Sequence, residues 1–394
     1  MRVSTLELFF DLVFAFTLTQ LAALLADHLS LSGVAQVLLV FGVLWWMYGG
    51  YAWLTNTRTP ERTTERLLLL AGMAGFLVVG LAIPHGFATA GFTPGGLTLG
   101  LGYLVVVLVH STLYYRVNRN IVRIAPINIA SALLVILAGV VGGLAAYPLW
   151  AAALAIQVLS PLVIRLAGRF EIQPAHFAER HGALIIVALG ESVAAVGIGA
   201  SRLAVSVQVV TAAVLGLALS AALWWIYFGE SDDERAGQAM ATADRERRPG
   251  LALSGYFYPY IPMLLGIVVL AAGLKLTIGN AAQPHSAGQA LALGGGTALF
   301  LAGNAMFRQA LGLSALGPSA RGLAARASAA RRIGSAWPRY VTAVFALATT
   351  ALGATVAIEA QLAVLLAGLV AMLAAERYRA TRAVALVRED GVRD

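Results

Sequence analysis

The apolar residues of the chain come in successive blocks of about 18 to 24 residues, separated by short polar stretches. An α-helix rises about 1.5 Å per residue, so a block of this length crosses the roughly 30 Å of hydrocarbon in a membrane. The blocks are apolar on every face, whereas the strands of a membrane β-barrel alternate in polarity. Twelve membrane-spanning helices are therefore predicted, at residues 8–27, 34–55, 66–84, 96–115, 124–144, 147–166, 182–201, 206–229, 251–274, 288–308, 338–356 and 358–377.

Composition agrees with this pattern. Of the 394 residues, 59% are hydrophobic and only 12% are charged, which lies outside the usual balance of a water-soluble domain. The predicted fold class is an all-α polytopic membrane protein. No cleavable signal peptide is expected, because the first apolar block holds an acid and a glutamine. The chain has no cysteine, which excludes disulfides, thiolate metal sites and cysteine nucleophiles.

The net charge of +8 comes from cations that cluster in alternate loops. The predicted helices place Arg202 and Lys275 on one side of the membrane and the other 25 of the 27 Lys and Arg residues on the opposite side. By the positive-inside rule both termini face the cytoplasm. The basic charge is therefore attributed to topology and to anionic lipid headgroups, and nucleic acid is not an expected partner.

An internal repeat divides the chain. The sequence WWMY at residues 45–48 recurs as WWIY at 224–227, and Asp11 precedes the first pair of tryptophans by 34 residues as Glu191 precedes the second by 33. Two further pairs of landmarks recur in the same order, Glu65-Arg66 with Glu246-Arg247 and Arg119-Asn120-Ile121 with Arg331-Arg332-Ile333. Two parallel six-helix repeats are predicted, at residues 1–170 and 171–394. The alternative is an old duplication whose second copy kept only its packing.

Three stretches carry a resemblance to a known family: ELFFDLVFAFTLTQL at residues 7–21, HFAERHGALIIVALGESV at 176–193 and WWIYF at 224–228. Along nearly its whole length the chain resembles the bacterial low temperature requirement protein A family. This resemblance implies a multi-pass protein of the bacterial inner membrane. It implies no particular chemistry, because the family name records a cold-growth phenotype.

A more distant resemblance suggests a mechanism. The stretch FFDLVFAF at residues 9–16 is similar to the F-S-D motif in the first helix of potassium and proton channels built from six-helix repeats. Phe9 and Asp11 fall on the motif, Phe10 replaces its serine, and Thr5 stands where an arginine is expected. This partial match makes channel function a hypothesis.

Two acids stand out within the apolar blocks. Glu191 lies about ten residues inside its predicted helix, or roughly 15 Å deep, where an acid usually marks a pathway or relay. The alternative is a neutral glutamate that bonds to a neighbouring helix. Asp11 is shallower, with Glu7 one turn earlier on the same side, and the free N–H groups of the helix start offer a structural explanation for both. Gln20 continues this polar stripe or bridges helices.

Three further residues complete the candidate transport or binding site. His110 and Asn128 are expected at the depth of Asp11, where an imidazole and an amide could relay protons or bind a small ion; the alternative is a packed, hydrogen-bonded histidine. Tyr258 lies in a stretch where Pro259 and Pro262 loosen the helix and free backbone carbonyls.

Other charged residues are interpreted as helix ends. Glu179, Arg180 and His181 are expected to precede the seventh helix as a solvated or ion-paired entrance, and Arg308 to reach the membrane surface. No metal or cofactor is expected, because H-E-x-x-H, a pair of histidines four apart and a phosphate-binding G-x-x-x-x-G-K-[ST] motif are all missing from the sequence.

Two classes of function follow. The first is an ion- or proton-coupled channel or transporter, with Asp11 and Glu191 facing one another at the interface of the repeats. The second is an intramembrane enzyme, similar to membrane terpene cyclases, in which one of these acids protonates a lipophilic isoprenoid-type substrate. A structural membrane protein is a third option. The expected partners are membrane lipids and a small ion or small lipophilic molecule, and a homo-oligomer is left open.

Overall fold

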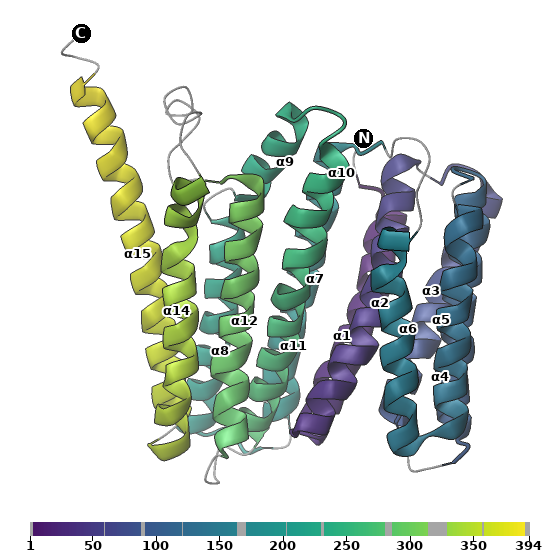
Figure 1. The fold of residues 1–394 in the computed structure, drawn as a ribbon. Helices are drawn as coiled ribbons and strands as arrows, with labels where there is room; N and C mark the ends of the chain where they lie inside the picture. Colours follow the sequence, from purple (N-terminus) through teal and green to yellow (C-terminus); the bar gives the residue numbers. More distant parts are fainter. Residues whose placement is uncertain are drawn as a thin grey trace. The chain divides into compact units, whose positions relative to one another are not determined.

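The computed structural model describes residues 3–58, 60–87, 91–119, 121–163, 171–201, 203–229, 232–279, 286–313, 329–356 and 358–390. All regular structure within these ranges is helical (Figure 1). The elements are α1 (Thr5–Asp27), α2 (Leu31–Thr57), α3 (Thr63–Ala82), η1 (Ile83–His85), α4 (Pro94–Tyr115), α5 (Ile121–Val141), α6 (Gly143–Val163), α7 (Pro174–Ala200), α8 (Val207–Phe228), α9 (Asp232–Thr242), α10 (Arg248–Leu251), η2 (Ala252–Phe257), α11 (Tyr258–Gly279), α12 (Ala287–Leu311), α14 (Ala329–Thr355) and α15 (Ile358–Asp390).

The predicted fold class is confirmed. Over the described ranges, eleven helical stretches are long and apolar enough to cross a membrane. Helix α14 covers nearly all of the predicted span at 338–356 as well. The protein is therefore an all-α polytopic membrane protein. Arg202, expected on the side opposite most cations, lies outside the described residues.

The chain forms two compact units, Met1–Ala188 and Leu189–Asp394. The boundary falls inside α7, so the first unit holds α1 to α6 with the first half of α7, and the second unit holds the remaining elements. The predicted repeat at 1–170 and 171–394 stays a prediction.

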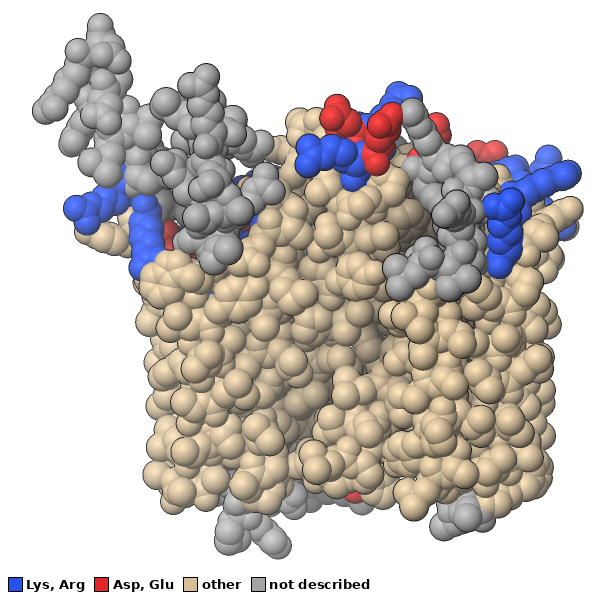
Figure 2. Space-filling view, viewed as in Figure 1, with Lys and Arg blue, Asp and Glu red and all other residues tan. Residues whose placement is uncertain are grey.

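Exposed cations gather at helix ends. In each unit, the Lys and Arg side chains on the visible face lie at one end of the helices, and the lengths of the helices below carry none (Figure 2). Arg58 and Arg116 are examples in the first unit, and Arg245 and Arg247 in the second. This distribution fits helices embedded in hydrocarbon, where a charge on the lipid face is costly.

Aromatic rings join α1 to its neighbours in the first unit. The ring of Phe14 lies 4.3 Å from that of Tyr48, and the ring of Phe10 lies 4.9 Å from that of Tyr51, measured between centroids. Phe76 of α3 packs edge-on against both phenylalanines. These contacts fix the face of α1 that points inward, and the acids of that face are buried with it.

Glycines allow the closest helix contacts, as is usual between membrane helices. A Cβ atom built on Gly139 of α5 would lie 2.2 Å from the carbonyl oxygen of Gly96 in α4. In the second unit, a Cβ atom on Gly266 of α11 would lie 2.6 Å from the carbonyl oxygen of Gly296 in α12. The backbones of these pairs therefore touch without intervening side chains.

The predicted start of the seventh helix is wrong. Helix α7 begins at Pro174 rather than at residue 182, and a proline suits the first helical position, where no N–H bond is lost. The sequence of residues 176–181 suggests a solvated segment at the entrance to the membrane, because four of the six residues are polar. In the structure they form helical turns in which His176, Arg180 and His181 are buried and hydrogen-bonded, whereas Glu179 is exposed.

We expect Gly139→Ala to lower the free energy of unfolding by about 1–3 kcal/mol, because the added methyl group forces α4 and α5 apart. The measurement is the thermal stability of purified protein in detergent. Gly197→Ala is the matched control, since nothing described lies within 4 Å of its Cβ position. Equal stability of the two variants would contradict the close α4–α5 contact.

Candidate functional site

Helix α1 presents two buried acids on one face. Ser4 caps the helix, and its backbone N–H and hydroxyl donate to Glu7 Oε2 at 2.9 and 2.8 Å. Asp11 follows one turn later on the same side. Both acidic side chains are 0% exposed. The helix start accounts for one oxygen of Glu7, as predicted, but Asp11 lies beyond the reach of the free N–H groups.

Arg180 of α7 is the partner of both acids. Its Nε and Nη2 donate to Asp11 Oδ1 at 3.2 and 3.0 Å, and its Nη1 lies 3.5 Å from Glu7 Oε1. Nη1 also donates to the hydroxyl of Thr55 in α2. Of the two expectations for Arg180, a solvated or an ion-paired helix end, the structure shows the ion pair: Arg180 is 1% exposed. Its guanidinium provides a cation at the depth of the two acids.

Aromatic rings enclose this ion pair. The guanidinium carbon of Arg180 lies 5.5 Å from the ring centre of Phe10 and 5.6 Å from that of Tyr48, distances at which a cation is attracted to a ring face. The Tyr48 hydroxyl donates to Asp11 Oδ1 at 2.9 Å. Asp11 Oδ1 thus accepts three hydrogen bonds. Its other oxygen, Oδ2, is buried and has no hydrogen-bond partner among the described residues.

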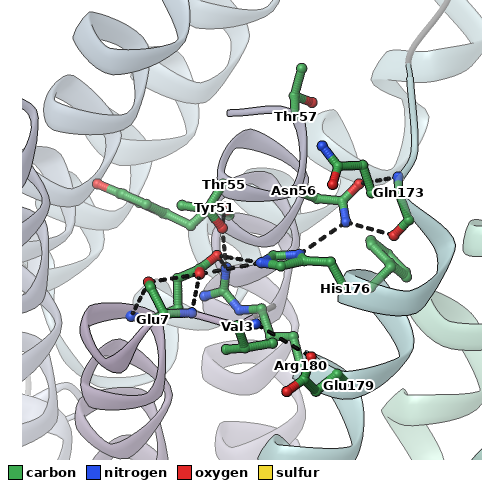
Figure 3. Close-up of polar contacts among 12 residues, drawn as sticks. Val3, Glu7, Tyr51, Thr55, Asn56, Thr57, Gln173, His176, Glu179 and Arg180 are labelled. Atoms are coloured by element: carbon green, nitrogen blue, oxygen red, sulfur yellow. Dashed lines mark hydrogen bonds and ion pairs between the residues drawn. The ribbon is translucent and has the colours of Figure 1, made fainter. Parts of the chain in front are cut away.

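The Asn56 amide determines the protonation of His176. Asn56 Oδ1 accepts from the Gln173 backbone N–H at 2.9 Å, so its Nδ2 faces the Gln173 carbonyl and His176 Nδ1, both at 3.1 Å (Figure 3). An amide nitrogen only donates, so Nδ1 accepts and carries no proton. The ring proton therefore lies on Nε2, which donates to Glu7 Oε2 at 3.2 Å. In this arrangement His176 is neutral.

We call Glu7, Asp11, His176 and Arg180, with Tyr48, Thr55 and Asn56, the α1–α7 cluster. It lies wholly within the first compact unit. Two carboxylates face one guanidinium and a neutral imidazole, so negative charge is in excess whenever both carboxylates are ionised. The sequence signal that could have located the cluster is the spacing of His176 and Arg180, which places them four residues apart on one helix face.

The other predicted site residues lie elsewhere in the described structure. His110 of α4 is buried against Tyr51 and Tyr114, with ring centres 5.2 and 5.4 Å away. Neither of its ring nitrogens has a hydrogen-bond partner among the described residues. Asn128 of α5 is also buried, and the shared depth of these two residues stays a prediction.

Gln20 is half-buried on α1, nine residues beyond Asp11. Tyr258 begins α11 directly after the π-helix η2 and is 49% exposed. Glu191 is half-buried in α7, 17 residues after its start. The pairing of Asp11 with Glu191 across the repeats stays a prediction.

A second buried charge cluster lies in the second unit. Arg339 of α14 forms a two-bonded fork with Glu376 of α15, with Nε and Nη2 at 3.1 and 3.0 Å from the two carboxylate oxygens. Arg308 of α12 lies 3.0 Å from Asp232 Oδ2, and Arg339 lies 3.4 Å from the same atom. Asn304 Oδ1 accepts from Arg339 as well. We call these five residues the α14 cluster.

This cluster corrects the interpretation of Arg308, which is buried and paired instead of reaching the membrane surface. Each of its two carboxylates faces at least two guanidinium groups, and Arg235 also lies 3.3 Å from Asp232 Oδ1. Sequence reasoning missed it because its members come from α9, α12, α14 and α15, so no local spacing links them. Over the described residues, no group of three or more His, Asp or Glu side chains is arranged to hold a metal ion.

Comparison with known proteins agrees with the sequence resemblance. The sequence profile described as "Bacterial low temperature requirement A protein (LtrA)" matches residues 2–375. A curated relative, uncharacterized protein RA0937 of Rhizobium meliloti (strain 1021), is 28% identical over 325 residues. The alignment covers 78% of this chain and 77% of the relative.

Arg180→Met should destabilise the protein by about 3–5 kcal/mol, because it leaves two buried carboxylates without a cation. The triple variant Glu7→Gln/Asp11→Asn/Arg180→Met, which carries no charge at these positions, should recover part of the loss. Thermal stability and the yield of monodisperse protein in detergent measure both effects. The control is Arg66→Met, at an exposed position; a single variant as stable as this control would refute the pairing.

The α14 cluster generates a parallel expectation. Arg339→Met should lower the free energy of unfolding by about 3–5 kcal/mol. The double variant Arg339→Met/Glu376→Met should lose less than the sum of the losses of the two single variants, because both members of the ion pair are removed together. A double-mutant cycle in thermal stability measures this coupling. Arg379→Met, at an exposed position of the same α15 helix, is the control. Strict additivity would contradict a direct pair.

Proposed function

The chain belongs to the bacterial low temperature requirement A family, and from its buried charges we propose that it is a proton- or cation-coupled channel or transporter. It is an integral membrane protein with many apolar helices. We further propose that it resides in the bacterial inner membrane with both termini in the cytoplasm. The exposed arginines at helix ends support this orientation by the positive-inside rule.

The observation that carries the proposal is the excess of negative charge in the α1–α7 cluster. Glu7 and Asp11 share one guanidinium, and the Asn56 bond keeps His176 neutral. An uncompensated charge within the membrane is expensive and usually functional. A proton or a small monovalent cation bound at the cluster would remove it. Asp11 Oδ2, which is buried without a hydrogen-bond partner among the described residues, offers the lone pairs.

Occupancy of this site would change how α1 is held. Asp11 Oδ1 accepts two bonds from Arg180, and these bonds draw their strength from the negative charge of the carboxylate. A proton on Asp11 weakens them and leaves Arg180 with Glu7 and Thr55. The contacts between α1 and α7 therefore differ between the bound and the empty state. A ligand can drive a conformational change only when it interacts differently with the two conformations, and this difference in contacts provides such an interaction.

The same geometry supports an intramembrane enzyme less well than a channel or transporter. A general acid must hold a proton that it can donate. Glu7 and Asp11 are both fully buried against Arg180, so neither carboxyl group is presented to a substrate. Glu191 remains the candidate acid for chemistry on an isoprenoid-type substrate, and as a second carboxylate it also remains a candidate for transport.

Asp11→Asn should reduce proton or cation flux at least tenfold, because the amide keeps the shape of the side chain and removes the charge that binds the ion. The measurement is dye-monitored proton flux and potassium or sodium flux in liposomes that contain purified protein. Asp27→Asn is the matched control, an exposed aspartate on the same helix. Glu191→Gln tests the other predicted acid in the same assay.

Size-exclusion profiles establish that the variants are folded. The proposal fails if Asp11→Asn carries the flux of the wild type, or if the folded wild type moves neither protons nor monovalent cations under any imposed gradient.

A further inference from the structure

A small cavity lies where the ends of α2, α3 and α4 meet in the first unit. Its volume is about 30 Å³, enough for one or two water molecules. Its walls include Leu69 of α3 and Leu113 of α4, both buried. An isoprenoid chain does not fit a cavity of this size, whereas water does.

The mouth of the cavity is charged. Arg58 and Arg116 line it, and Arg58 pairs with Glu65 at 3.4 Å. The Arg58 side chain is 46% exposed, whereas that of Glu65 is 8% exposed. The mouth therefore combines exposed cations with a buried acid, and water that enters the cavity finds polar partners there.

Thr55 joins the cavity to the α1–α7 cluster. It lines the cavity, and its hydroxyl donates to the Tyr51 carbonyl at 3.2 Å and accepts from Arg180 Nη1. Arg180 in turn contacts Glu7 and Asp11. One hydroxyl thus separates the cavity from the guanidinium that holds both acids.

We propose that this cavity is the aqueous access route by which protons reach the α1–α7 cluster, an inference that rests on the proposed transport function. The cavity has room for one or two water molecules and is too small for a hydrated metal cation. Protons move along water without a metal cation having to pass. The transported ion is therefore the proton, and Thr55 is the inner end of the route.

The test measures whether water reaches the side chains that line the cavity. The chain has no cysteine, so a single introduced thiol gives an S–H infrared band that shifts on exchange with deuterium oxide. Thr55→Cys is compared with Thr17→Cys. Both threonines are buried and donate to a backbone carbonyl of their own helix, but Thr17 does not line the cavity. The Thr55→Cys thiol should exchange at least tenfold faster.

A second pair of cysteine variants is needed because Thr55→Cys itself removes the hydroxyl that Arg180 contacts. Leu69→Cys lines the cavity and Leu18→Cys does not, and both leucines are buried in the first unit. If neither Thr55→Cys nor Leu69→Cys exchanges faster than its control, the access route is refuted, whatever flux the wild type carries. Proton flux that persists without sodium or potassium supports the proton assignment, and flux that requires either cation overturns it.

The two proposals fail separately. If the cavity thiols exchange fast but the wild-type protein carries no flux of any ion, the water route is supported and the transport function is refuted. Flux without fast exchange keeps transport and refutes the route.

Discussion

The buried guanidinium of Arg180 is the contact on which the first unit depends. Burying two ionised acids one turn apart in a membrane is costly without a cation at the same depth. Arg180 supplies that cation from a segment almost 170 residues away in sequence. Because its long side chain reaches Asp11, Glu7 and Thr55 together, it ties α1, α2 and the first half of α7 to one another.

The second unit meets a similar constraint with a different balance. Arg308 and Arg339 face Asp232 and Glu376, and Arg235 adds a third guanidinium at Asp232, so no carboxylate of the α14 cluster lacks a cation. Such a network stabilises helix packing once all of its members are present. In the α1–α7 cluster two carboxylates share one guanidinium, so one negative charge is uncancelled when both are ionised. The two clusters therefore differ in their ratio of carboxylates to guanidinium groups.

The tautomer of His176 links these electrostatics to the local fold. Its Nδ1 accepts from Asn56, whose orientation is set by the backbone of Gln173 just before α7. The neutral imidazole therefore reflects how the start of α7 packs against the end of α2. A second cation at His176 would require this packing to change, because Asn56 cannot accept through its Nδ2.

Much of the architecture could be predicted from the sequence. Long apolar blocks specify membrane helices because hydrocarbon requires every backbone group to bond within its own segment. Buried Asp11 and Glu7 were identified from their position and spacing. Their partner was not, because His176, Glu179, Arg180 and His181 together look like a polar helix entrance, and local polarity does not reveal which side chains turn inward.

The sequence by itself therefore determined the class, the helices and the presence of costly acids. Only the tertiary structure decided what neutralises those acids, since a charge pair depends on distance in space and not on separation along the chain. It likewise assembled Asp232, Arg308, Arg339 and Glu376 from four helices. No periodicity encodes such a contact, because each helix satisfies its own backbone and leaves the pairing of its polar side chains to packing.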